Sequence, residues 1–138
     1  MSNNAIAEAM LAYLNRWEGK PVTIALELAD KKPVSMCMQQ LSGTVVEKRY
    51  IDGTFIGIWP FAVYVHVSGR DTSQRLKAVQ YLATLGEWME DATLPKLGNG
   101  RSAISVEMTA LPALAIRYEN GDEDYQAMYG LKYKQRSD

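Results

Sequence analysis

One histidine and two short acidic runs are the side chains of this sequence with the clearest potential for chemistry. A catalytic triad or a histidine-based metal cluster would need companions that His66 lacks. Glu90 and Asp91 fall at the end of an expected helix, and the second acidic run falls at the tip of an expected hairpin. Both places are usual for solvated charges. We therefore expect His66 to be structural and predict no catalytic residue.

Three other patterns could indicate a binding site. Cys37 is the single cysteine, so it can form no disulfide within the chain, and we expect a buried structural thiol. The acidic run at residues 119–124 does not have the spacing of an EF-hand loop. The Gly98-Asn99-Gly100 segment does not lead from a strand into a helix, as a phosphate-binding loop does. The sequence predicts no cofactor and no metal site.

Composition and charge favour a small soluble domain whose net charge would not attract nucleic acid or an acidic membrane. The 138 residues suit one domain, expected to cover residues 1–138 with a frayed tail at 134–138. Fifteen Lys and Arg residues oppose sixteen Asp and Glu residues, and the basic ones are scattered. Sequence-specific nucleic-acid binding is therefore not expected. No signal peptide and no long apolar run is visible, so we expect neither secretion nor a membrane-spanning segment.

Apolar spacing and turn residues predict two helices and several strands that could position these side chains. The first helix is expected to be capped by Ser2 or Asn3 and to end at residues 19–21. The second is expected to start after a cap at residues 71–73 and to run through Met89. Strands are expected at residues 22–28, 34–41, 44–51, 54–67, 101–109, 114–118 and 125–133.

Residues 44–67 form the most informative segment. Asp52-Gly53 predicts a hairpin turn, because Gly tolerates a positive φ and strand-like residues stand on both sides. The second strand of this hairpin is apolar on both faces, so both need cover, and another subunit could supply part of it. Pro60 has no amide to donate and predicts a bulge or an exposed edge position.

The order of these elements predicts the fold class. Tight turns join most neighbouring strands, which favours antiparallel pairing. We expect an α+β, two-layer domain, with an antiparallel or mixed β-sheet and two main helices packed on one face. The opposite face carries enough apolar surface to need a partner.

Several segments resemble a known family. They are the helix ending near Trp17, the YIDGTFIGIWPFAVYV strand pair, LGEWM at residues 85–89, LPKL at residues 94–97, and the closing hairpin with YENG and YQA. In this arrangement the chain resembles the tail-terminator or tail-completion proteins of long-tailed bacteriophages, often labelled minor capsid proteins in prophages. The family has no catalytic residues, so the resemblance implies that the protein is not an enzyme.

The resemblance also implies an assembly and a location. Family members oligomerise, typically into a hexameric ring on the last ring of the tail tube. The ring stops tube growth and offers a surface to the head connector. The expected partners are therefore further copies of the chain, the tail-tube protein and the head connector protein. The expected location is the head–tail junction of the virion, after synthesis in the cytoplasm of the bacterial host.

Two groups of residues are candidates for roles in such a ring. Apolar residues of the second hairpin strand are candidates for the subunit interface, although they could equally belong to the core of one chain. The acidic residues at the hairpin tip are candidates for a channel-facing surface that repels DNA phosphates. The interface candidates are Phe55, Ile58, Trp59 and Phe61, and the acidic candidates are Asp122, Glu123 and Asp124.

Two alternatives remain open at this stage. The chain could be another head–tail connector or tube subunit that uses the same kind of sheet. It could also be a small ligand-binding domain or enzyme resembling nuclear-transport-factor-like folds. That alternative needs a buried carboxylic acid beside an apolar cavity, whereas the acidic residues of this sequence fall mainly at turns and helix ends.

Overall fold

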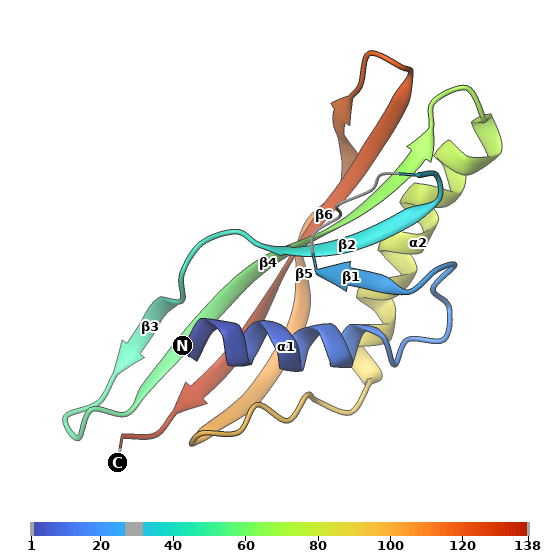
Figure 1. Ribbon diagram of the computed structural model, residues 1–138. Coiled ribbons are helices and arrows are strands. Elements are labelled where there is room, and N and C mark those ends of the chain that lie inside the picture. The colour runs from blue at the N-terminus through green and yellow to red at the C-terminus, as the bar shows by residue number, and fades with distance from the viewer. Residues whose placement is uncertain (1, 27–31, 138) are drawn as a thin grey trace.

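The computed structural model describes residues 2–26 and 32–137 of the chain, with two helices and six strands in these ranges (Figure 1). No helix within them is long and apolar enough to cross a membrane. In chain order the elements are α1 (Ser2–Leu14), β1 (Ile24–Leu26), β2 (Ser35–Gln40), β3 (Val45–Arg49), β4 (Phe55–Ser68), α2 (Thr72–Asp91), β5 (Arg101–Arg117) and β6 (Asp122–Gln135).

The strands form one mixed sheet around β4. The order is β1-β2-β4-β6-β5, and β3 also pairs with β4. Only the β1–β2 pair is parallel, and the other pairs are antiparallel. β6 follows β4 from the Phe55–Gln135 pair to the Ser68–Asp122 pair, so these two strands run side by side along the molecule (Figure 1). On its other side β4 is shared between β3 and β2.

This sharing explains how a central strand tolerates Pro60. The register between β4 and β6 runs unbroken through Pro60, which lies opposite Gly130. The carbonyl of Pro60 accepts a hydrogen bond from the Leu41 amide, so its backbone faces the side of β2 and β3. There it falls between Ile58, the last residue paired with β3, and Phe61, the first paired with β2. The predicted bulge or exposed edge is wrong, because the missing amide faces a gap between two strands.

Helix α2 begins where its sequence predicts, but its buried face is shifted, because Leu76 and Val79 are exposed. The Asp71 side chain accepts a hydrogen bond from the Gln74 amide and caps the first turn. A buried stripe then faces the sheet, formed by Ala78, Leu82, Leu85, Gly86 and Met89. A Cβ on Gly86 would lie 2.8 Å from Cε of Met108 on β5, so glycine permits a close approach between helix and strand.

Helix α1 ends earlier than its sequence predicts. It stops at Leu14, and the Asn15 side chain donates to the carbonyls of Leu11 and Ile24 and accepts from the Ile24 amide. These bonds turn the chain from the helix into β1, so the predicted end at residues 19–21 is wrong. The side chains of the expected caps, Ser2 and Asn3, lie outside the described residues, as do residues 27–28 of the predicted strand at 22–28.

Both helices contribute to one cluster of buried residues on one face of the sheet. The odd-numbered residues of β4 and β6 face it, and Trp59, Phe61 and Tyr129 are 0% exposed. The Phe61 and Tyr129 rings stack at 5.4 Å, and the Tyr129 hydroxyl donates to the Leu82 carbonyl of α2. Burial raises the pKa of Tyr129. Tyr13 of α1 lies 5.0 Å from Trp88 of α2, ring to ring. The α+β prediction is confirmed.

Two strand predictions need correction at the far end of the chain. The expected strands at 101–109 and 114–118 are one 17-residue strand, β5, whose pairing with β6 shifts register at four places. An outermost strand tolerates Pro112 and these irregularities, since only one of its edges must pair. The tail expected to fray continues β6 through Gln135, and the Arg136 amide donates to the Gly100 carbonyl. Residue 138 lies outside the described ranges.

Candidate functional site

The four residues predicted at a subunit interface divide into two pairs. Trp59 and Phe61 are fully buried within one chain, so their expected place at an interface is wrong. The reason is the cover that α1 and α2 supply to the odd-numbered face of β4. Phe55 and Ile58 are half-buried near the N-terminal end of β4. The Phe55 ring meets Tyr133 edge-on at 6.2 Å, and the Arg49 guanidinium lies 5.5 Å from its centre.

Ile58 belongs to the sheet face that points away from the buried cluster. Cross-strand pairing places it in one row with Val45, Lys132 and Ser105. Lys132 pairs with Glu47 at 3.0 Å, and Val45 is 57% exposed. This part of the face therefore mixes apolar side chains with a solvent-accessible ion pair, which suits a subunit contact better than a core.

Exposed apolar side chains also lie at well-separated places on the surface. Ile51, in the turn between β3 and β4, is completely exposed, and Leu111 on β5 is 81% exposed. Leu76 on α2 is 64% exposed and lines a shallow groove with Val79 and Tyr125. β5 lies at one edge of the sheet, with β1 at the other. Unpaired strand edges commonly mark contacts with other chains, whereas apolar residues exposed singly are normal on a protein surface.

Glu123 is not the exposed acid that its place near a hairpin tip predicts. It is 3% exposed and accepts hydrogen bonds from Nε of Arg75 at 3.0 Å, Nε of Arg117 at 2.9 Å and the Tyr125 hydroxyl at 3.1 Å. Burial opposes ionisation, but these bonds and the two arginine charges outweigh it. The pKa of Glu123 is therefore lowered.

Asp122 and Asp124 point to the opposite face of β6 and meet His66 on β4. Nδ1 of His66 lies 2.6 Å from Oδ1 of Asp124, and Nε2 lies 3.0 Å from Oδ2 of Asp122. The Tyr118 hydroxyl donates to the second oxygen of Asp124 at 2.5 Å. His66 is 3% and Asp124 5% exposed. The prediction of an exposed, repelling acidic tip is wrong for Glu123 and Asp124, because both carboxylates are buried. Two arginines pair with Glu123, and His66 and the Tyr118 hydroxyl bind Asp124.

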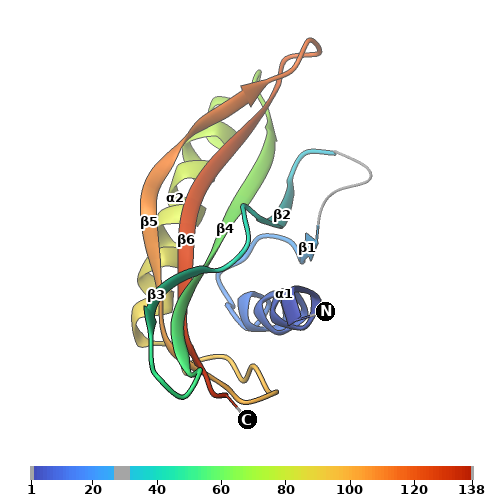
Figure 2. The ribbon, with the colours of Figure 1, turned by 90° about the vertical axis from the view of Figure 1, so that its left-hand side faces the viewer.

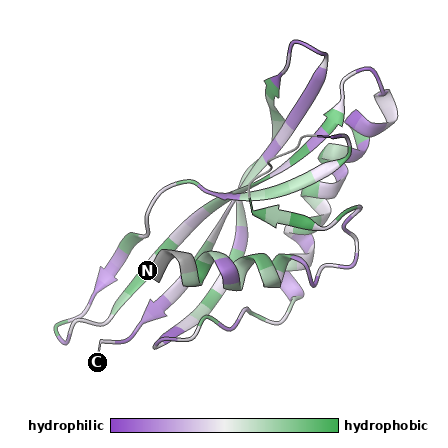
Figure 3. Cartoon of the chain, viewed as in Figure 1, coloured by the Kyte–Doolittle hydropathy of each residue, from purple (hydrophilic) through white to green (hydrophobic). Residues whose placement is uncertain are grey.

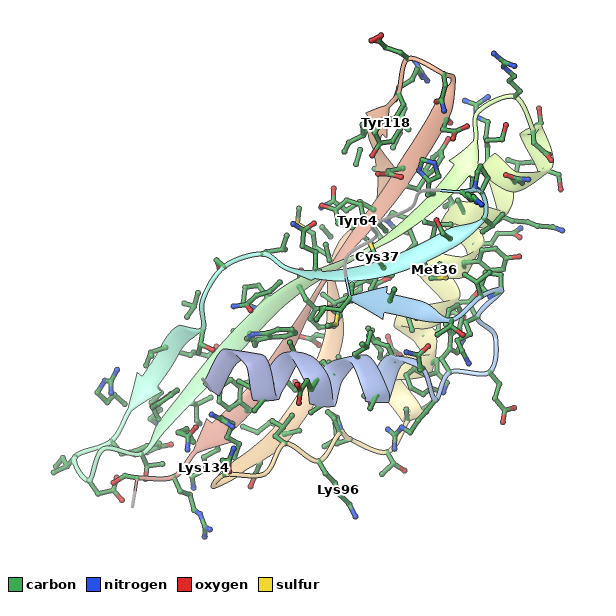
Figure 4. The ribbon with its side chains drawn as sticks, in the orientation of Figure 1. Met36, Cys37, Tyr64, Lys96, Tyr118 and Lys134 are labelled. Atoms are coloured by element: carbon green, nitrogen blue, oxygen red, sulfur yellow. The ribbon has the colours of Figure 1, made fainter. Side chains whose placement is uncertain are left out.

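We name the group of His66, Tyr118, Asp122 and Asp124 the histidine cluster. It lies at the end of the β5–β6 hairpin that carries the turn, where Figure 4 labels Tyr118. Figure 3 shows mainly hydrophilic segments at this end. Sequence reasoning missed it because 56 and 58 positions separate His66 from Asp122 and Asp124. Alternation along β6 could have placed the two aspartates on one face. The register that brings them to His66 was not readable from the sequence.

The space between the helices and the sheet is filled by side chains. Met10, Trp59, Phe61 and Tyr129 are all 0% exposed there. The larger surface hollows are open and lie on the outside, as between the end of α1 and α2 around Trp17 and Trp88. Within residues 2–26 and 32–137 no three His, Cys, Asp or Glu side chains are grouped to hold a metal ion. This geometry gives no support to a ligand-binding domain with an internal pocket.

Comparison with known proteins adds a structural likeness. No protein-family model matches the sequence, and no curated protein matches it. Among solved structures, a chain in the virion of the native gene transfer agent (GTA) particle has the same fold, with a TM-score of 0.64. The match covers 94% of this chain and 98% of that chain, at 10% sequence identity. Such a low identity shows a shared fold and no more.

Proposed function

We propose that this chain is a structural subunit of a phage-like virion and, more specifically, a tail-terminator or tail-completion protein. The observation that carries the proposal is the fold shared with a virion chain over almost the whole length of both. The segments that resemble tail terminators point the same way. A structural subunit needs no active site, which suits a fold whose interior is filled with side chains.

The arrangement of exposed apolar residues supports assembly into a ring. Ile51 and Leu111 lie on different elements, so a contact that joined one site to the other would be head-to-tail. Head-to-tail contacts between identical chains generate rings when the rotation closes. We propose a ring of six copies, following the resemblance, with Ile58 on the outward face of the sheet at the contact and with Phe55, which packs partly against the buried cluster, at its margin. Trp59 and Phe61 then make the subunit rigid from inside.

The remaining partners follow from a place at the head–tail junction. One side of the ring would bind the last ring of the tail tube, and the other would bind the head connector. We propose that the β5–β6 hairpin end, with Asp122, Glu123 and Asp124, faces the DNA channel. Because arginine and histidine side chains pair with these acids, this end would present nearly balanced charge to passing DNA.

Tube assembly in the presence of the purified chain tests the proposal. The tube protein encoded in the same gene cluster would be polymerised with and without it and viewed by electron microscopy. A terminator shortens the tubes and adds density at one end. Incorporation along the whole tube would instead indicate a tube subunit, and tubes unaffected in length and bare at both ends would refute the proposal.

A matched pair of variants makes this experiment specific. Ile51→Ser changes a fully exposed side chain at a hairpin turn and should leave folding intact. Lys96→Ser changes an exposed residue on the connection between α2 and β5 and serves as the control. We expect reduced capping with Ile51→Ser and normal capping with Lys96→Ser.

A further inference from the structure

The histidine cluster carries an inference that is independent of the proposed function. Both ring nitrogens of His66 face carboxylate oxygens, at 2.6 Å and 3.0 Å. A neutral imidazole carries a proton on only one nitrogen, whereas an ionised carboxylate only accepts. Both hydrogen bonds are therefore made together when the ring carries both protons and the two aspartates are ionised. The short Nδ1 contact fits a charge-assisted bond.

We propose that His66 is a proton-controlled latch that holds the end of the β5–β6 hairpin against β4. While doubly protonated, the ring binds Asp122 and Asp124 at once. After loss of one proton, one ring nitrogen faces a carboxylate with no hydrogen to share. The hairpin end then loses one of the contacts that join it to β4, and its opening becomes more frequent.

The surroundings of the ring define which other groups take part. On β6 the two aspartates face the ring. In the turn between β5 and β6, the Tyr118 ring meets the His66 ring edge-on at 5.4 Å, and the Tyr118 hydroxyl binds Asp124. On β2 the paired residue, Ser35, is uncharged. Arg70 lies close to the hairpin tip, since its Nε would be 3.5 Å from a Cβ built on Gly121. Lys32 lies three positions before Ser35 in the chain. Glu123 points to the opposite face, where Arg75 and Arg117 bind it.

One backbone hydrogen bond reports directly on the latch. The Gly69 amide, just after β4, donates to the Gly121 carbonyl at the tip of the hairpin, at 3.0 Å. This bond breaks when the hairpin end moves away from β4. The Asp71 amide donates to the Ser68 carbonyl within the same loop, and the Gly121 amide donates to Tyr118 within the hairpin. Neither of these two depends on the hairpin staying in contact with β4.

The sign of the pH dependence follows from the charges. A histidine that gains carboxylate partners on folding stabilises the folded contact while it is protonated, and this contribution is lost as the pH rises. We therefore expect hydrogen exchange of the Gly69 amide, corrected for intrinsic exchange, to accelerate about tenfold between mildly acidic and alkaline pH, a size that suits the loss of one charge-assisted bond. Exchange at Asp71 and Gly121 should not follow this change.

The experiment uses the whole chain, nuclear magnetic resonance and two variants. In the wild type, both ring nitrogens of His66 should carry protons at the pH at which Gly69 is most protected. His66→Gln should expose Gly69 at every pH and remove the pH dependence. Arg75→Gln, on α2, removes a partner of Glu123 on the other face of β6 and should leave the pH dependence unchanged. A single-proton ring at that pH, or Gly69 exchange that does not respond to pH in the wild type, would overturn the proposal even if no variant folds.

Discussion

For Trp59 the sequence left open a surface between subunits or the core of one chain, and the side chain lies in the core. It is 0% exposed and packs 5.5 Å from the Phe61 ring. We expect Trp59→Ala to lower the free energy of unfolding by about 3–5 kcal/mol, because it removes a large buried side chain and leaves a cavity. Urea denaturation measures this loss. A loss below about 1 kcal/mol would show that the site is not tightly packed.

The ionised carboxylate of Glu123 should contribute to the pH dependence of stability. Its pKa is lowered, so the ionised carboxylate stabilises the folded chain above the pKa of an unfolded glutamate. That contribution is lost as the pH falls through the folded value. In Glu123→Gln the free energy of unfolding should be lower at neutral pH and should fall less steeply on acidification. Denaturation curves across the acidic range measure both effects, and identical slopes for the two chains would count against the prediction.

Helix α2 provides a prediction at the scale of an element. Asp71→Ala removes the side chain that accepts the Gln74 amide and should cost about 1 kcal/mol of stability. Asp91→Ala, at the exposed C-terminal end of the same helix, is the matched control and should cost nothing, because a carboxylate there opposes the helix dipole. Equal losses in the two variants would mean that the cap is not what stabilises this end.

Elements with strong local signals could be predicted from the sequence. The structure has α2 at residues 72–91 and β4 at 55–68, close to the expected ranges, because apolar spacing, Asp71 and the Asp52-Gly53 turn act locally. The sequence predicted two strands, at 101–109 and 114–118, where the structure has the single strand β5, and Pro112, a local signal against a strand, lies between them. The tertiary position of β5, at the edge of the sheet, removes most of that penalty.

The surface sites could be predicted less well, for a different physical reason. Residues 122–124 were recognised as clustered acids, but Arg75 and Arg117 pair with Glu123, and His66 binds Asp122 and Asp124. These partners come from three other elements. Likewise, both faces of β4 were recognised as apolar, yet only the fold shows that two helices of the same chain cover one of them. Pairing between distant segments depends on register and helix placement, which local patterns do not encode.

The whole molecule combines a core that is filled with side chains and a surface on which exposed apolar residues lie far apart. The core is filled with side chains, and Ile51, Leu111 and Leu76 are exposed on the surface. Exposed apolar residues scattered singly would need no explanation. In the proposed ring, the positions of Ile51, Leu111 and Leu76 on a hairpin turn, an outer strand and a helix would suit contacts with several neighbours at once.

The mass of the assembled protein tests whether the chain forms a closed ring. Native mass spectrometry, supported by light scattering at high protein concentration, gives the number of chains per particle. The account predicts a closed oligomer of defined size, six copies by the resemblance to tail terminators, that forms alone or on the end of tail tubes. A strict monomer at high concentration, with no ring on added tubes, would contradict it.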